Sequence, residues 1–189
     1  MSAPPVLVRT LDSIDPFFDQ DAGPIFPPEA IRALAGIDGI EDELLAVASD
    51  AEQPIARRFG AAEALFQGGW TGWRDGDRAP VVAQVMADAI AADGIHNRWG
   101  LPGHSVGRSG ADLLSIGDGV EAALEPLLDD QRRLSIDGGE SATVADTHAW
   151  RIADLAGYLL AQRRGEAWKD DPDPAVRDAE IERLRRGAA

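Results

Sequence analysis

The sequence predicts an all-α fold, because most of the chain after residue 28 consists of Ala- and Leu-rich segments with a helical period. The clearest segment is 120–128, where apolar residues recur at positions i, i+3, i+4, i+7 and i+8. Residues 152–160 repeat this spacing and are followed by Gly165, a typical helix stop. Alternation of the kind expected in β-strands is limited to little more than residues 6–8. We therefore predict an α-helical domain over residues 29–189.

The elements can be predicted in chain order. Residues 1–28 hold six of the twelve prolines and show no helical period, which predicts an extended N-terminal arm. The arm is expected to be anchored on the body by Phe17, Phe18 and Phe26. Helices are then expected at residues 40–48, 55–66, 81–90, 120–128, 152–160 and 174–186. Pro80 and Pro174 stand at helix starts, where the first turn tolerates proline.

The charge of the chain limits its function. The 189 residues include 33 acidic and 18 basic side chains, which gives a net charge of -15 at pH 7. Proteins that bind nucleic acid neutralise phosphates with Lys and Arg, so this excess of acid argues against nucleic acid and against anionic membranes. It favours a soluble chain, or one with a basic protein partner. With no apolar run of membrane-spanning length and no signal-peptide pattern, we expect a cytoplasmic protein.

No cofactor or metal is predicted from the motifs. The chain has no cysteine, which excludes disulfides, thiolate metal sites and cysteine nucleophiles. It has no P-loop, and no dinucleotide-binding glycine motif follows a strand. No two histidines have the i, i+4 spacing that places two ligands on one helix face. A nitrogen and oxygen metal site would have to combine His96, His104 and His148 with Asp93, Asp112 or Asp146.

The chain contains an internal repeat. The Arg-x-Gly-Ala pattern that begins at Arg58 returns at Arg108, and looser echoes begin at Arg151 and Arg177. These arginines are separated by 50, 43 and 26 residues. The first two intervals suit a repeat built from a pair of helices, which is about 40–47 residues long. The shorter third interval predicts a capping unit at the C-terminal end.

The repeat unit resembles a known family. Residues 40–45 (IEDELL), with Asp50, Arg58 and residues 61–65 (AAEAL), are similar to a HEAT repeat, and more particularly to short bacterial HEAT-like repeats related to those of phycobilisome lyases. Residues 171–177 (DPDPAVR) resemble the start of another inner helix, whereas the middle units depart from the pattern. The resemblance implies a short solenoid of about three helical pairs. An irregular helical bundle is the alternative arrangement.

The segment 103–107 (GHSVG) matches G-x-S-x-G, which resembles the nucleophile elbow of α/β-hydrolases. In that case Ser105 would attack, with His148 as the base and Asp146, or alternatively Asp154, as its partner. The elbow needs a preceding apolar strand, and the glycine and proline in residues 97–102 oppose one. Serine hydrolysis is therefore kept as an alternative function, together with a lyase-like activity by analogy with the phycobilisome relatives.

The tryptophans in loops are candidate binding residues. Trp70 and Trp73 lie in a glycine-rich loop and Trp99 lies in the loop 93–105. Tryptophan and arginine in loops often dominate binding, although these indoles could instead fill the core. In a solenoid, loops 93–105 and 131–143 share one edge and should be neighbours. The predicted binding residues are Trp70, Trp73, His96, Asn97, Arg98, Trp99, His104, Arg132 and Arg133, with Glu140 on the same edge.

These observations together favour a protein-interaction module without catalytic activity of its own. An adaptor, an assembly factor and an inhibitor of a basic protein remain equally open.

Overall fold

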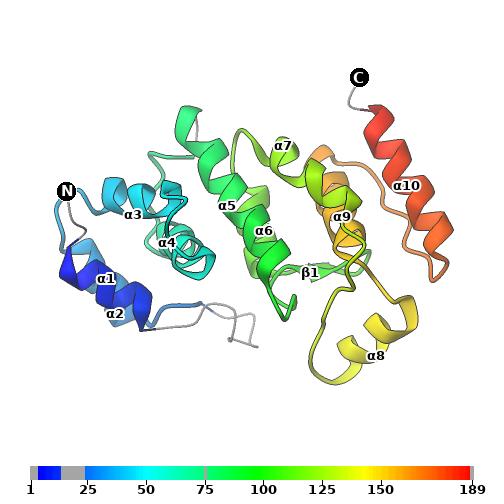
Figure 1. The fold of residues 1–189 in the computed structure, drawn as a ribbon, viewed down its shortest axis with the longest axis horizontal. Helices are drawn as coiled ribbons and strands as arrows, with labels where there is room; N and C mark the ends of the chain where they lie inside the picture. The colour runs from blue at the N-terminus through cyan, green and yellow to red at the C-terminus, as the bar shows by residue number, and fades with distance from the viewer. Residues whose placement is uncertain (1–3, 14–23, 75, 188–189) are drawn as a thin grey trace.

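The computed structural model describes residues 4–13, 24–74 and 76–187, and these residues confirm the all-α prediction. Their helices follow one another along the longest axis, from α1 at one end to α10 at the other (Figure 1). None of the described helices is both long enough and apolar enough to cross a bilayer. The elements are α1 (Pro5–Asp12), α2 (Pro28–Ala35), α3 (Ile40–Ser49), α4 (Ile55–Gln67), η1 (Gly76–Arg78), α5 (Ala79–Ala92), β1 (Gly100–Leu101), β2 (Ser105–Val106), α6 (Arg108–Leu114), α7 (Val120–Leu124), η2 (Glu125–Asp129), α8 (Gly139–His148), α9 (Ile152–Arg164) and α10 (Pro174–Gly187).

The N-terminal segment differs from the extended arm predicted for residues 1–28, because Pro5–Asp12 forms helix α1. Pro5 stands in the first helical turn, where its missing N–H costs no hydrogen bond. Leu7 and Leu11 lie four residues apart on one face and are buried, and the helix packs against α2 and α4. Two buried leucines are too few for a recognisable helical period, which is why the sequence did not reveal this helix.

Phe26 anchors the chain on the body as predicted. Its side chain is buried, and the side-chain amide of Gln67 on α4 both accepts from its N–H and donates to its carbonyl, each at 2.9 Å. Phe17 and Phe18 lie outside the described residues.

Helices α3, α4 and α5 confirm the predictions for residues 40–48, 55–66 and 81–90. Each of the three packs against both of the others. Helix α4 is buried along residues 59–66, which include one glycine and three alanines. These small side chains let neighbouring helices approach closely, which explains the alanine-rich composition.

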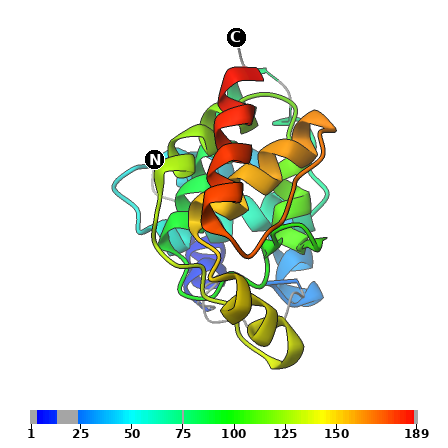
Figure 2. The ribbon, with the colours of Figure 1, turned by 90° about the vertical axis from the view of Figure 1, so that its right-hand side faces the viewer.

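In the C-terminal half, the predicted helix over residues 120–128 is divided in two. Helix α7 ends at Leu124 and continues as the 3₁₀ helix η2, since Pro126 has no N–H to donate to an α-helical ladder. Helix α9 confirms the prediction for residues 152–160 and is buried over nearly its whole length. Helix α8 was not predicted, and Figures 1 and 2 show it standing apart from the other helices. Its sequence is polar, and Ala145 is its one buried residue.

The last helix is attached by a buried ion pair. Arg177 of α10 lies with its Nε 3.1 Å from Oδ2 of Asp154 on α9, and both side chains are almost inaccessible to solvent. Arg151 also contacts Asp154, at 2.7 Å, so one buried carboxylate is shared by two guanidinium groups. Removal of Asp154 would leave the buried guanidinium of Arg177 without its anionic partner, which is strongly destabilising.

A second buried polar network joins α4 to α6. The Ser109 hydroxyl of α6 donates to Oε1 of Glu63 on α4 at 2.5 Å, and Nη1 of Arg98 lies 3.4 Å from the same hydroxyl. The Arg98 guanidinium also lies over the ring of Phe59, 5.9 Å from its centre. All three polar side chains are buried, and loss of solvation raises the pKa of Glu63 to about 7.

The raised pKa of Glu63 predicts a loss of stability as the pH rises. From the ordinary value of 4.5 to about 7, the folded protein keeps a proton that the unfolded chain has released. The contribution of Glu63 to the free energy of unfolding is therefore complete below pH 4.5 and is lost by about pH 7, a change on the order of 3 kcal/mol. Glu63→Gln, which cannot ionise, should remove this part of the pH dependence in urea unfolding.

The matched control is Glu125→Gln, since Glu125 is an exposed residue of η2. This variant should show the same dependence of the free energy of unfolding on pH as the unchanged protein. Parallel profiles for the protein and its Glu63→Gln variant would contradict the assignment.

Candidate functional site

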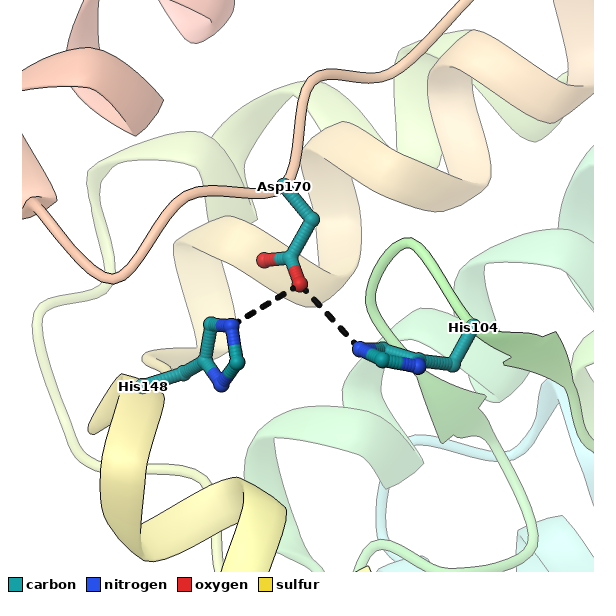
Figure 3. Close-up of side chains that lie close together, drawn as sticks. All are labelled: His104, His148 and Asp170. Carbon is teal, nitrogen blue, oxygen red and sulfur yellow. Dashed lines mark ion pairs between the residues drawn. The ribbon is translucent and has the colours of Figure 1, made fainter.

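Two predicted histidines meet an aspartate that the sequence did not single out (Figure 3). His104 lies in the turn between β1 and β2, His148 is the last residue of α8, and Asp170 lies between α9 and α10. Oδ2 of Asp170 is 3.2 Å from Nε2 of each histidine. The side chains of His148 and Asp170 are 14% and 13% exposed, whereas that of His104 is 47% exposed. One side of the cluster therefore faces solvent.

Trp150 supports this cluster from within the protein. Its buried indole stacks on the His148 ring, with centres 4.7 Å apart and an angle of 22° between the planes. The indole Nε1 donates to Oδ1 of Asp170 at 2.9 Å, so both carboxylate oxygens have partners. Nδ1 of His148 lies 3.0 Å from the carbonyl oxygen of Val144, one helical turn earlier. Stacking and hydrogen bonds thus fix the orientation of His148 and Asp170.

The glycines of the GHSVG segment are explained by a tight hairpin. Gly103 has a φ of +77°, and a Cβ there would lie 2.4 Å from Cβ of Asp170. A Cβ at Gly107 would lie 2.3 Å from the carbonyl oxygen of Arg98. Gly103 therefore lets the hairpin approach Asp170, and Gly107 lets it approach its own preceding segment. Neither glycine belongs to a strand–turn–helix elbow of the hydrolase type.

The triad considered for a serine hydrolase is not assembled. Ser105 is exposed on β2, and its hydroxyl has no hydrogen-bond partner in the described part of the chain. Asp146 is 80% exposed and pairs with Arg133 at 2.8 Å. His148 contacts Asp170 in place of either residue. Asp154, the other acid considered, is engaged by Arg151 and Arg177.

The prediction that loops 93–105 and 131–143 are neighbours is confirmed. The N–H of His96 donates to the carbonyl of Ser135 at 2.7 Å. The side-chain amide of Asn97 donates to the carbonyl of Asp137 at 2.6 Å and accepts from its N–H at 2.9 Å. The two loops are therefore joined by main-chain and side-chain hydrogen bonds.

Three of the residues predicted to bind a partner on this edge, His96, Arg98 and Trp99, are buried. The Trp99 ring packs 5.4 Å from that of Phe59, and its Nε1 donates to the buried Asp93 at 3.0 Å. Burial stabilises an indole whose single polar group has a partner. These three side chains therefore belong to the core and are not available to a partner.

His96 is a core histidine whose hydrogen bonds are satisfied. Its Nε2 lies 3.1 Å from the carbonyl oxygen of Ile90, and its Nδ1 accepts from the N–H of Ser135 at 3.2 Å. Burial lowers the pKa of His96, which favours the neutral ring that these contacts require. Burial also raises the pKa of Asp93. His96, Asp93 and Asp112 all lie outside the cluster formed by His104, His148 and Asp170.

The other predicted binding residues are divided between surface and core. Arg132 and Arg133 are exposed and pair with Asp130 and Asp146, respectively, and Asn97 is half-buried. Trp73 is buried, with its ring edge-on to Phe66 at 4.9 Å, so it fills the core, which is the alternative that the sequence left open for it. Glu140 is exposed on α8.

Trp70 is half-buried and lines a shallow hollow of about 610 Å³ beside the start of α3. Its lining includes three acidic residues and one basic residue, Arg78, which pairs with Asp42 at 2.8 Å. Oε1 of Glu41 is buried with no hydrogen-bond partner among the described residues. A second hollow of about 360 Å³ shares Asp42 and Arg78. The first hollow is lined by Ala35, Ile37, Asp38, Gly39, Ile40, Glu41, Asp42, Trp70, Gly72 and Arg78.

Comparison of the chain with protein-family models, with curated proteins and with solved structures finds no match in any of the three. The function must therefore be argued from the residues themselves.

Sequence reasoning missed Asp170 and the hollow. Asp170 lies in a short acidic run with no motif around it. The sequence of residues 38–42 predicts only a solvated helix start, and these residues line the hollow because the fold brings them close to Trp70.

The hairpin geometry predicts that Gly103→Ala is destabilising. The substitution places a side chain at a φ of +77° and against Asp170, so we expect a loss of about 1–3 kcal/mol in the free energy of unfolding. The matched control is Gly94→Ala, since a Cβ there meets nothing within 4 Å. It should change stability by no more than about 0.5 kcal/mol. Equal midpoints of chemical unfolding for the two variants would contradict the role given to Gly103.

Proposed function

We propose that the chain is a protein-interaction module without catalytic activity of its own, acting as an adaptor, an assembly factor or an inhibitor. Its partner would be a protein with a basic segment, bound in the hollow beside Trp70. The observation that carries this proposal is a half-buried tryptophan held in an acidic depression. No observation favours the hydrolase or lyase alternatives.

The position of Trp70 suits an anchor for a partner. Its ring folds over Gly68, where an added Cβ would lie 2.0 Å from the indole. Its carbonyl oxygen accepts from Nε1 of the buried Trp73 at 2.9 Å. The indole is therefore already ordered while part of it remains exposed. Such rigid aromatic side chains contribute strongly to binding, because little conformational entropy is lost when a partner contacts them.

The charges around Trp70 favour a basic ligand. Asp38 and Asp42 are exposed, and the chain as a whole carries a net charge of -15. A lysine or arginine of the partner could pair with these carboxylates while its side chain lies over the indole, where cation–π attraction adds to the contact. The acidic field of the whole protein would also accelerate the encounter with a basic partner.

The second hollow adds room for apolar side chains. It is lined partly by Leu45, Ala46 and Val81 of α3 and α5. Because the two hollows share the pair of Asp42 and Arg78, one extended or helical segment could occupy both. The partner segment is thus inferred to combine basic with apolar residues.

We further propose that the fold is a short HEAT-like solenoid. The succession of helices along one axis supports this arrangement (Figure 1). A second support is that two arginines aligned by the internal repeat both donate to main-chain carbonyl oxygens. Arg58 donates to the carbonyl of Ala48 at the end of the preceding helix, and Arg177 donates to the carbonyls of Asp171 and Pro172 before its own helix. An interaction module is a common use of such extended stacks.

Affinity capture from an extract of the cells that encode the chain tests the hollow. The tagged protein should retain a stoichiometric basic partner at moderate salt. Trp70→Ala and the double variant Asp38→Lys/Asp42→Lys should each weaken retention by at least about tenfold, as expected of an anchor and its charges.

The charge-matched control is Asp118→Lys/Glu125→Lys, which alters two exposed acidic residues elsewhere. It should retain the partner as the unchanged protein does. Absence of any partner, or equal retention by the hollow variants, would contradict the proposal. Loss from every variant alike as salt rises would show unspecific attraction to an acidic surface and would also contradict it.

A further inference from the structure

We propose that His104, His148 and Asp170 bind one divalent transition-metal ion of the Zn²⁺ type. The proposal does not depend on the partner-binding hollow, which involves other residues. It rests on the hydrogen-bonding capacity of His148, on the spacing of the three side chains and on the groups that hold them.

The hydrogen bonds of His148 call for a cation beside Nε2. Nδ1 lies 3.0 Å from the carbonyl oxygen of Val144, which can only accept, so Nδ1 carries a hydrogen. In the neutral ring Nε2 is then a bare acceptor, and it faces the carboxylate of Asp170 at 3.2 Å. Two acceptors at this distance repel each other unless a proton or a metal ion lies between them. A histidine that donates from one nitrogen to a main-chain carbonyl and binds metal with the other is a common arrangement.

The spacing of the three groups fits a metal of this size. Ligands that surround Zn²⁺ tetrahedrally at about 2.0–2.1 Å are separated from one another by about 3.3 Å. Oδ2 of Asp170 is 3.2 Å from Nε2 of each histidine, and one ligand atom from each of the three residues lies within 4.8 Å of the others. Small rotations of the side chains would therefore complete the geometry. Two imidazoles with one carboxylate suit Zn²⁺, whereas Mg²⁺ and Ca²⁺ prefer oxygen alone.

The surroundings of the cluster are those of a built site. Trp150 donates to Oδ1 of Asp170, which leaves Oδ2 for the metal, and its ring stacks on His148. Gly103 lets Asp170 come within reach of the hairpin. The exposed side of His104 gives the ion a route of entry, and three protein ligands leave a fourth position for water.

A metal here would join three segments that are distant in sequence. They are the hairpin β1–β2, the end of α8 and the connection between α9 and α10 (Figure 3). Helix α8 has little other attachment, because Ala145 is its one buried residue. Metal binding should therefore stabilise the position of α8 and raise the thermal stability of the whole chain.

Calorimetric titration with zinc chloride tests the proposal. The untagged full chain is freed of metal with a chelator and titrated near neutral pH, where carboxylates are ionised. We expect one ion per chain with a Kd in the micromolar range or below. His104→Ala and Asp170→Asn should each weaken binding by at least about tenfold, the loss that even an outer-shell partner can cause. Cobalt(II) should give the visible absorption of a four-coordinate ion.

The matched control is Asp146→Asn, which removes an exposed carboxylate on the same helix as His148 but outside the cluster. It should bind zinc as the unchanged protein does. Magnesium chloride should give no comparable binding. His104→Ala keeps the test interpretable if Asp170→Asn fails to fold, because His104 is half exposed.

Absence of saturable binding, or a Kd weaker than about 100 μM, would overturn the proposal. Zinc binding that is unchanged in both cluster variants would also overturn it, since exposed carboxylates would then be the ligands.

Discussion

The burial of the connection between α5 and α6 is the constraint on which the rest of the structure depends. This connection carries Asp93, His96, Arg98 and Trp99 into the interior. A buried neutral polar group that lacks a hydrogen-bond partner lowers stability by on the order of 1–3 kcal/mol, and a charged group lowers it by more. Asp93 and Trp99 are matched to each other within the connection, whereas His96 and Arg98 are matched by groups on other elements. The partners available on α4, on α6 and in the loop after η2 determine where those elements lie.

The matching fixes several elements at once. Glu63 and Ser109 bring α4 and α6 together around Arg98, while the main chain of Ser135 holds the loop after η2 against His96. Phe59 supplies apolar contact to both Arg98 and Trp99. The network includes a carboxyl group that burial favours in its protonated form, so the core has a polar centre that is coupled to pH. Displacement of any one of these elements would break the hydrogen bonds that join it to the others.

The surface cluster inherits its geometry from this buried connection. Once residues 93–99 are fixed, the chain can only leave the core through the hairpin that follows, and the hairpin carries His104 outward. A Cβ at Gly107 would lie 2.3 Å from the carbonyl oxygen of Arg98, so glycine there lets the hairpin pack closely against the end of the buried connection. Asp170 approaches from the other side, held by the indole of the buried Trp150. The proposed metal ligands are thus placed by rigid groups behind them, which is what a binding site requires.

The apolar period was sufficient to predict the central helices but not the direction in which loop side chains face. Residues 40–48, 55–66, 81–90 and 152–160 carry enough buried side chains to show a period, so their helices followed from the sequence. Helix α8 buries only Ala145, and α1 only two leucines, so neither left a period to detect.

Whether a loop residue faces inward depends on groups far away in the chain, and local sequence does not contain that information. Trp99 and Arg98 were expected on the surface because they are in a loop, yet Phe59 and the pair of Glu63 and Ser109, separated by 46 residues, complete an interior place for them. The cluster of His104, His148 and Asp170 could not be predicted for the same reason, since no motif surrounds Asp170 and only the fold brings it beside the two histidines. A polar residue in a connection is therefore best judged by whether distant groups can satisfy it in the interior. Glu41 shows the opposite outcome, because its Oε1 is buried beside the half-buried Trp70 and has no hydrogen-bond partner among the described residues.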